Sequence, residues 1–216
     1  MRIRNIRQLL PVIGALVVVF ASVGTVQAAS NSTFNQTING GTLATDILDA
    51  GRNPVASPSA AMAAANFSFD CQTVTGTLGT TSQRLYVTNP SGTANGWTLS
   101  LGATGGGTAV WTDGGTNDYA FNDAAGSGCT NGQLTVNPTV ATVNDDCVST
   151  ACTGATVTKG SSTVMTGGTD VDLMSGDSSA NVYRGYLTGI SLSQKIPAEQ
   201  PAASYSINMT LTVAAD

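Results

Sequence analysis

A strict alternation of apolar and polar residues near the C-terminus constrains the fold more than any other feature of the chain. From Tyr205 to Val213, the odd-numbered positions carry large apolar or aromatic side chains, and the even-numbered positions carry Ser, Asn or Thr. Because successive side chains of a strand point to opposite faces, this period of two predicts a strand with one buried face. Pro197 and Pro201 precede the segment and disfavour a helix there.

A second segment has the same pattern and follows a loop that begins at Asn89-Pro90. Trp97, Leu99 and Leu101 occupy alternate positions there, so they share one strand face. Short runs rich in Val and Thr recur along the rest of the chain between Gly, Pro and Asn, and no run has a convincing helical period. The sequence therefore predicts an all-β protein, a single β-sandwich domain with short strands and long Gly/Asn/Asp loops. The expected core includes Trp97, Leu99, Leu101, Ile190, Leu192, Tyr205, Ile207, Met209 and Leu211.

The N-terminal residues have the composition of an export signal. Basic residues at Arg2, Arg4 and Arg7 precede an almost continuously apolar run, and small residues before Ala28 suit a signal peptidase. We expect residues 1–28 to be a cleaved signal peptide; the alternative is an uncleaved membrane anchor. Residues 29–41 form a polar N-terminal segment, either a flexible leader or a weak first strand. Residues 42–216 form the sandwich domain.

Charge argues against one large class of partners. Removal of the signal peptide leaves five basic residues against thirteen acidic ones, a net charge of −8. An acidic surface with scattered cations offers no patch for a phosphate backbone, which argues against nucleic-acid binding. We expect a secreted protein with no membrane span after signal cleavage.

The chain contains four cysteines, Cys71, Cys129, Cys147 and Cys152. An even number in an exported chain indicates two disulfides, for which three connectivities exist. Cys147 and Cys152 are close enough in sequence for a local bridge, and Cys71 with Cys129 would then join distant segments. A zinc site is the alternative, although the chain lacks both a Cys-x-x-Cys spacing and histidine.

Two segments resemble the WxL domain family of bacterial cell-surface proteins. The first is Gly96-Trp97-Thr98-Leu99, which is similar to the first signature of that family. The second is the proline- and alanine-rich approach to the last strand, residues 196–205, after which Met209-Thr210-Leu211 stands where the family has a second Trp-x-Leu. The resemblance implies an exported all-β protein that attaches non-covalently to the cell wall, with peptidoglycan as partner. The sequence shows no C-terminal sorting motif and no cysteine at the expected cleavage site, which agrees with non-covalent attachment.

Three aromatic residues are the candidate ligand-binding side chains: Trp97, Trp111 and Tyr119. An exposed indole can stack on a sugar ring, whereas a Trp that alternates with two leucines belongs in a sandwich core. Both interpretations of Trp97 remain open from the sequence. Trp111 lies just before an acidic loop that carries Tyr119, and it is the better candidate for exposure.

The same loop suggests a calcium site. Asp113, Asp118, Asn122 and Asp123 offer hard oxygen ligands on a glycine-rich segment, and calcium accepts such ligands in loose geometry. The spacing does not match an EF-hand loop, and Asp and Asn are also ordinary residues of solvated turns. Calcium is the single cofactor that the sequence suggests.

Catalysis has little support in the sequence. The chain contains no histidine, and Glu199 is the only glutamate. A glycosidase would need two carboxyl groups at a suitable separation, and the sequence identifies no two aspartates as such a pair. We therefore expect a non-catalytic cell-surface protein that binds peptidoglycan or another surface glycan. The alternative is a self-assembling subunit of a surface filament or layer, in which an edge strand pairs with a neighbouring copy.

Overall fold

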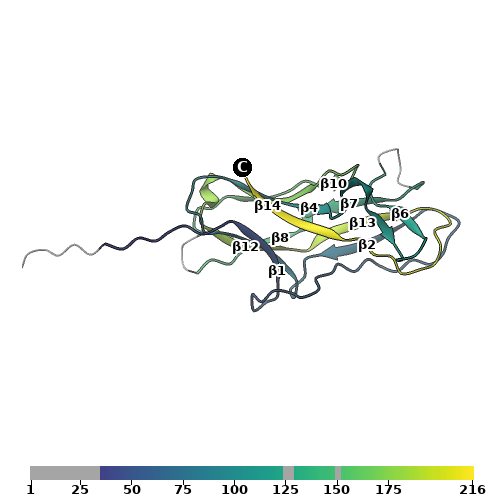
Figure 1. The fold of residues 1–216 in the computed structure, drawn as a ribbon, viewed down its shortest axis with the longest axis horizontal. Coiled ribbons are helices and arrows are strands. Elements are labelled where there is room, and N and C mark those ends of the chain that lie inside the picture. The colour runs from purple at the N-terminus through teal and green to yellow at the C-terminus, as the bar shows by residue number, and fades with distance from the viewer. Residues whose placement is uncertain (1–34, 124–128, 149–151) are drawn as a thin grey trace, which may run out of the picture. The chain divides into compact units, whose positions relative to one another are not determined.

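The computed structural model describes residues 35–123, 129–148 and 152–216. The described part of the chain consists of strands, loops and three short 3₁₀ turns, and residues 39–216 form one compact unit (Figure 1). The expected signal peptide lies outside the described residues. The strands are β1 (Ala44–Leu48), β2 (Gln72–Leu78), β3 (Arg84–Asn89), β4 (Trp97–Ala103), β5 (Val110–Thr112), β6 (Asp118–Ala120), β7 (Gln133–Asn137), β8 (Thr142–Asp145), β9 (Val157–Lys159), β10 (Thr163–Val164), β11 (Val171–Gly176), β12 (Tyr183–Thr188), β13 (Ile190–Ile196) and β14 (Met209–Ala215).

The first layer is built from three long strands, each of which is interrupted at the same level and so consists of two consecutive segments: β2 and β3, β7 and β8, and β12 and β13. The central long strand consists of β12 and β13, which are separated by Gly189 alone. On one side β3 pairs with β12 and β2 with β13, and on the other side β8 pairs with β12 and β7 with β13. β1 extends this layer beside β3, and β10 extends it beside β7. All of these pairings are antiparallel.

The interruption depends on two glycines. Gly79 and Gly189 both have φ of +80°, and the Gly189 N–H donates to the Gly79 carbonyl at 2.8 Å. Positive φ is accessible to glycine at little cost. Gly189 also changes which side chains face inward, because odd-numbered residues are buried in β12 and even-numbered residues are buried in β13. One inserted residue thus keeps both halves of the strand directed at the same core.

The second layer contains four strands in the order β14-β4-β11-β9, and a two-stranded sheet, β5-β6, lies beside the start of β14. Thr112 of β5 exchanges two backbone hydrogen bonds with Ser206, at 3.0 and 2.9 Å. The core between the layers is one continuous cluster that includes Leu85, Trp97, Leu99, Leu173 and Ile190. The predicted all-β sandwich is therefore confirmed.

Trp97 occupies the centre of this core and is fully buried. Its indole N–H donates to the carbonyl of Ala180 at 3.2 Å, and its ring stacks on Tyr183 with centroids 5.4 Å apart. Gly176 lies against the indole, since a Cβ at that position would fall 2.5 Å from two ring atoms. The core interpretation of Trp97 is confirmed, and the Gly-Trp-Thr-Leu segment has a structural role here.

Four residues of the expected core are covered less than predicted. Tyr205, Ile207, Met209 and Leu211 are half-buried, whereas Leu99 and Leu101 on the neighbouring strand β4 are buried. The physical reason is position. Met209 and Leu211 lie on β14, the edge strand of its sheet, Tyr205 and Ile207 lie in the segment before it, and all four line a cavity. Ile190 and Leu192 are buried as expected.

Two segments with strand-like sequence do not form strands. Residues 35–43 are without strand pairing, so a first strand in that part of residues 29–41 is not found. Phe67 and Phe69 also lie outside any strand, with 51% and 74% of their surfaces exposed. They pack on each other edge to face, with ring centroids 5.2 Å apart.

Both expected disulfides are present. Cys71 pairs with Cys129 and Cys147 with Cys152, with Cα–Cα distances of 5.3 and 5.7 Å. The first joins the chain just before β2 to the chain just before β7, and the second closes a local loop after β8. None of the helical turns in the described residues has the length and hydropathy required to span a bilayer.

Candidate functional site

A cavity of about 470 Å³ lies beside the β5-β6 sheet, and we call it the aromatic cavity. Trp111, Tyr119 and Tyr205 form one wall, and the alanine-rich segment 60–65 forms part of another. Phe67 lies at its margin, with half of its side chain exposed. Its size is typical of small-molecule sites, which combine apolar walls with a few polar groups.

The three wall aromatics are in mutual contact. The rings of Trp111 and Tyr119 are nearly parallel, at 12° with centroids 6.0 Å apart, and Tyr119 meets Tyr205 edge-on at 5.1 Å. All three side chains are half-buried, so each retains surface that a ligand can contact. Separations of this kind are favourable for aromatic pairs and hold the rings in place.

Local backbone contacts position this wall. Trp111 and Tyr119 are opposite each other in the β5-β6 ladder, and β5 is tied to the segment that carries Tyr205 through Thr112 and Ser206. Gly132 lies directly beneath the wall with φ of +95°, and a Cβ there would come within 2.9 Å of the Tyr119 ring. A glycine is required at that position both for its φ and for space.

The opposite wall is held by pairing with an edge strand. Ala63 donates its N–H to the Thr75 carbonyl at 2.7 Å, and Met62 forms a bridge with Gly76. The alanine-rich segment therefore runs beside the edge of β2. Small side chains let this segment lie close to the sheet and leave the cavity open.

A buried amide and two hydroxyls supply the polar groups. The Trp111 indole donates to the Gln194 side-chain oxygen at 2.9 Å, and Gln194 is 1% exposed. The Tyr205 hydroxyl donates to the Pro201 carbonyl at 2.7 Å and accepts from Gln200 at 2.8 Å. Burial, followed by the nearby Tyr205 hydroxyl, raises the pKa of Tyr119 to about 12. At neutral pH the cavity wall is thus uncharged.

The structure brings together two of the three predicted ligand-binding residues. Trp111 and Tyr119 line the aromatic cavity, whereas Trp97 is buried in the core and is not available to a ligand. Sequence reasoning missed Tyr205, Phe67 and Gln194 as site residues. Tyr205 was assigned to the core by its period-two pattern, and nothing in the sequence places Gln194 opposite Trp111.

The expected calcium ligands do not form a set. The Asp113 carboxylate accepts hydrogen bonds from Gly115 N and Asn117 Nδ2, both at 2.7 Å, so it closes its own turn. Asn122 donates its side-chain N–H groups to the carbonyls of Gly107 and Gly167. Asp118 is exposed on β6, and Asp123 lies beyond it. Within the described ranges, no three acidic, cysteine or histidine side chains come together to hold a metal.

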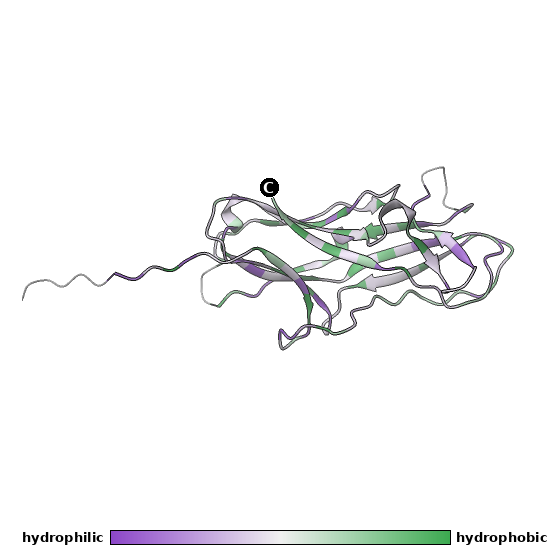
Figure 2. Cartoon of the chain, viewed as in Figure 1, coloured by the Kyte–Doolittle hydropathy of each residue, from purple (hydrophilic) through white to green (hydrophobic). Residues whose placement is uncertain are grey.

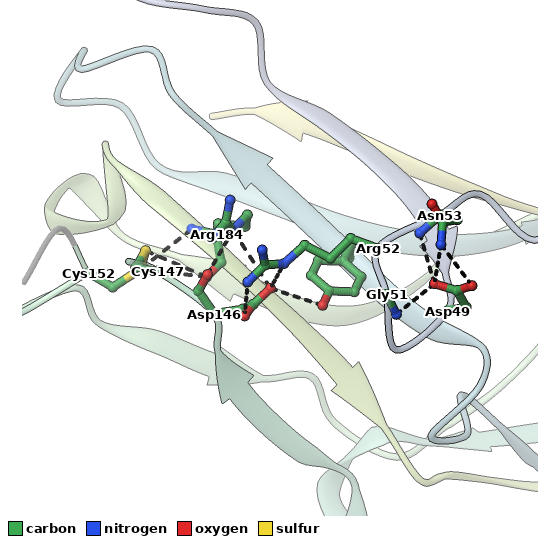
Figure 3. A network of polar contacts seen from close by, with 9 residues as sticks. Asp49, Gly51, Arg52, Asn53, Asp146, Cys147, Cys152 and Arg184 are labelled. Carbon is green, nitrogen blue, oxygen red and sulfur yellow. Dashed lines mark hydrogen bonds and ion pairs between the residues drawn. A yellow bond between two sulfur atoms is a disulfide. The ribbon is translucent and has the colours of Figure 1, made fainter. Parts of the chain in front are cut away.

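A charged cluster on another part of the fold has a structural role (Figure 3). Arg52 binds both carboxylate oxygens of Asp146, with N–O distances of 2.6 and 2.7 Å, and Tyr86 donates its hydroxyl to the same carboxylate at 3.0 Å. Arg184 donates to the Asp146 carbonyl at 2.7 Å and lies beside the Cys147–Cys152 disulfide. The hydrogen bonds from Arg52 hold the pKa of Asp146 below its usual range. The cluster joins the turn after β1 to β8 and β12.

Models of known protein families, curated proteins and solved structures contain no match to the chain. Membership of the WxL family therefore stays a prediction from the two sequence segments.

Proposed function

We propose that this protein is an exported, non-catalytic cell-surface protein that binds a cell-wall glycan in the aromatic cavity. The observation that carries the proposal is the wall of Trp111, Tyr119 and Tyr205 beside the buried amide of Gln194. Aromatic faces pack against the C–H faces of sugar rings, and amide and hydroxyl groups bind sugar hydroxyls. The WxL resemblance adds peptidoglycan as the wall polymer.

Two further observations support this class of function. The N-terminal leader and the two disulfides agree with an oxidising, extracellular location. The chain contains no histidine, the residue used most often for acid–base catalysis, and it contains a single glutamate. A cell-surface protein that occurs in many copies can retain a weak individual site, because many contacts with one polymer act together.

Tryptophan fluorescence tests the proposal directly, since the chain has only two tryptophans and one of them is fully buried. Titration with soluble muropeptides should change the emission of Trp111 in a saturable way, with little effect of salt because the contact is not ionic. Trp111→Phe should abolish the change and leave the emission of Trp97.

Phe67→Ala should weaken muropeptide binding about two- to tenfold, the range of one aromatic contact. Val182→Ala is the matched control, because Val182 is 42% exposed and lies outside the cavity. No saturable change in Trp111 emission with any muropeptide would contradict the proposal.

A further inference from the structure

A second cavity, of about 620 Å³, opens where the edges of the two layers meet, and we call it the seam. β1 supplies Thr45, Asp46 and Ile47 on one side, and the segment from Tyr205 to Leu211 supplies the other. β1 and β14 lie near each other there, but no ladder joins them. The seam extends down to Leu85, Leu101, Leu134 and Leu192, which belong to the buried hydrophobic core.

β14 presents an unused backbone edge to solvent. The Asn208 carbonyl accepts from Thr104 N, and Asp216 N donates to the Gly96 carbonyl, so even-numbered residues of this strand direct their backbone groups at β4. In an antiparallel ladder the intervening residues point the other way. The N–H and C=O groups of Met209, Leu211 and Val213 therefore face away from β4. Within the described residues β14 has β4 as its only ladder partner.

The side chains along this edge are incompletely covered. Ile207, Met209, Leu211 and Val213 are half-buried, while Leu99 on β4 is fully buried. Figure 2 shows the row as alternating apolar and polar bands on the C-terminal strand. An edge strand with open backbone groups and an uncovered apolar row is a template for strand addition.

We propose that the seam accepts residues 29–41 of a second copy of this chain as an added strand along β14. This inference goes beyond the proposed function. The seam adjoins the aromatic cavity and shares Trp111 and Tyr205 with it, whereas Phe67 lines the aromatic cavity and not the seam. Phe34 and Ile38 are four residues apart, so in a strand they share one face at about 13–14 Å. Ile207 and Leu211, or Met209 and Val213, have the same spacing in sequence.

The composition of the segment suits burial. Residues 29–41 contain no charged residue, so insertion buries no charge of the added segment itself. Ile38 is 87% exposed, which is the highest exposure of any large apolar side chain in the described residues. Residues 35–38 form no strand of their own, so their backbone groups can pair with an edge.

The backbone before β1 favours exchange between copies over insertion into the same chain. Gly41 donates its N–H to the Pro90 carbonyl at 2.9 Å, and a Cβ on Gly41 would fall 2.6 Å from the Pro90 ring. A Cβ on Gly40 would come even closer to the carbonyl oxygen of Ser91. These contacts hold the chain in line with β1, past the end of β3. Insertion into the seam of the same chain would require the backbone to reverse its direction next to these two anchored glycines.

Self-association of the exported chain tests the inference, with no glycan present. Ile38→Asp should weaken association at least about tenfold, because it removes a buried apolar side chain. Thr37→Asp is the matched control: it introduces the same charge at the neighbouring position, on the opposite face of the added strand, and should leave association unchanged. Both sites precede the sandwich, so neither substitution should alter its unfolding transition. Phe67→Ala should also associate normally, which separates this surface from the aromatic cavity.

Two measurements locate the contact. In the oligomer, the amides of Met209 and Leu211 should exchange with solvent more slowly than in the monomer, while Thr210 and Thr212 are protected in both. A photoreactive side chain at position 38, mixed with isotopically heavy unmodified protein, should cross-link to residues 207–213 of the heavy copy. A monomer at all concentrations, equal effects of Ile38→Asp and Thr37→Asp, or cross-links within one chain would each overturn the inference.

Discussion

Replacing Trp97 by alanine should destabilise the protein by about 3–5 kcal/mol, the usual cost of removing a large aromatic side chain from a core. The site offers little room for relaxation, because Tyr183 and Gly176 pack directly against the indole. The lost hydrogen bond adds little, since the Ala180 carbonyl keeps a second donor, Asn89 Nδ2, at 3.0 Å. Most of the cost is therefore loss of packing.

The loss of unfolding free energy should be measured by urea denaturation and the change in Tm by thermal denaturation. Both are followed by circular dichroism, with the disulfides intact. A domain of this size loses about 2–4 °C of Tm per kcal/mol, so Tm should fall by about 6–20 °C. Trp111→Ala is the comparison variant, and it should cost less because Trp111 is half-buried. A Trp97→Ala variant within about 1 kcal/mol of the parent would refute the assignment of Trp97 to the core.

Three further outcomes are expected. Tyr183→Phe should leave the unfolding free energy unchanged or raise it by up to about 1 kcal/mol, because the described part of the chain offers the buried Tyr183 hydroxyl no hydrogen bond of normal geometry; a loss of more than about 2 kcal/mol would contradict this. Thiol titration of the unfolded, unreduced protein should find no free sulfhydryl, given the two disulfides, and a stoichiometric thiol would be inconsistent with them. The lowered pKa of Asp146 means that its contribution to stability is present above the ordinary aspartate pKa and is lost as pH falls through the lower folded value. Asp146→Asn should therefore be less stable than the parent at neutral pH, and the difference should shrink in acid; a constant difference would argue against the ion pair.

The strand pattern of the sequence predicted much of the fold, because burial of one strand face leaves a period of two. The Trp97 segment and the buried positions Ile190 and Leu192 were located in this way. The last strand was located in part, since β14 begins at Met209 and not at Tyr205. The seam was not predictable, since alternation reports which face is apolar and not whether a neighbouring strand covers it. Tyr205 and Leu211 were therefore predicted to be core residues, although they are half-buried.

The candidate site was predicted only in part. Trp111 and Tyr119 flank a turn, so their proximity follows from a hairpin, which is local in sequence. Gln194 and Phe67 reach the same cavity through contacts between distant segments, for which the single sequence carries no signal. The acidic loop suggested a metal site because aspartates that close turns and aspartates that bind metals occur in loops of the same composition. The hydrogen bonds of Asp113 show that this carboxylate closes its own turn.

Co-sedimentation of the exported chain with purified peptidoglycan, at low and at high salt, tests the central claim most directly. The protein should sediment with peptidoglycan under both conditions, because aromatic stacking is insensitive to ionic screening. Phe67→Ala should sediment less, and Val182→Ala should sediment like the parent. Protein that remains in the supernatant at both salt concentrations would contradict the claim that the aromatic cavity binds the cell wall.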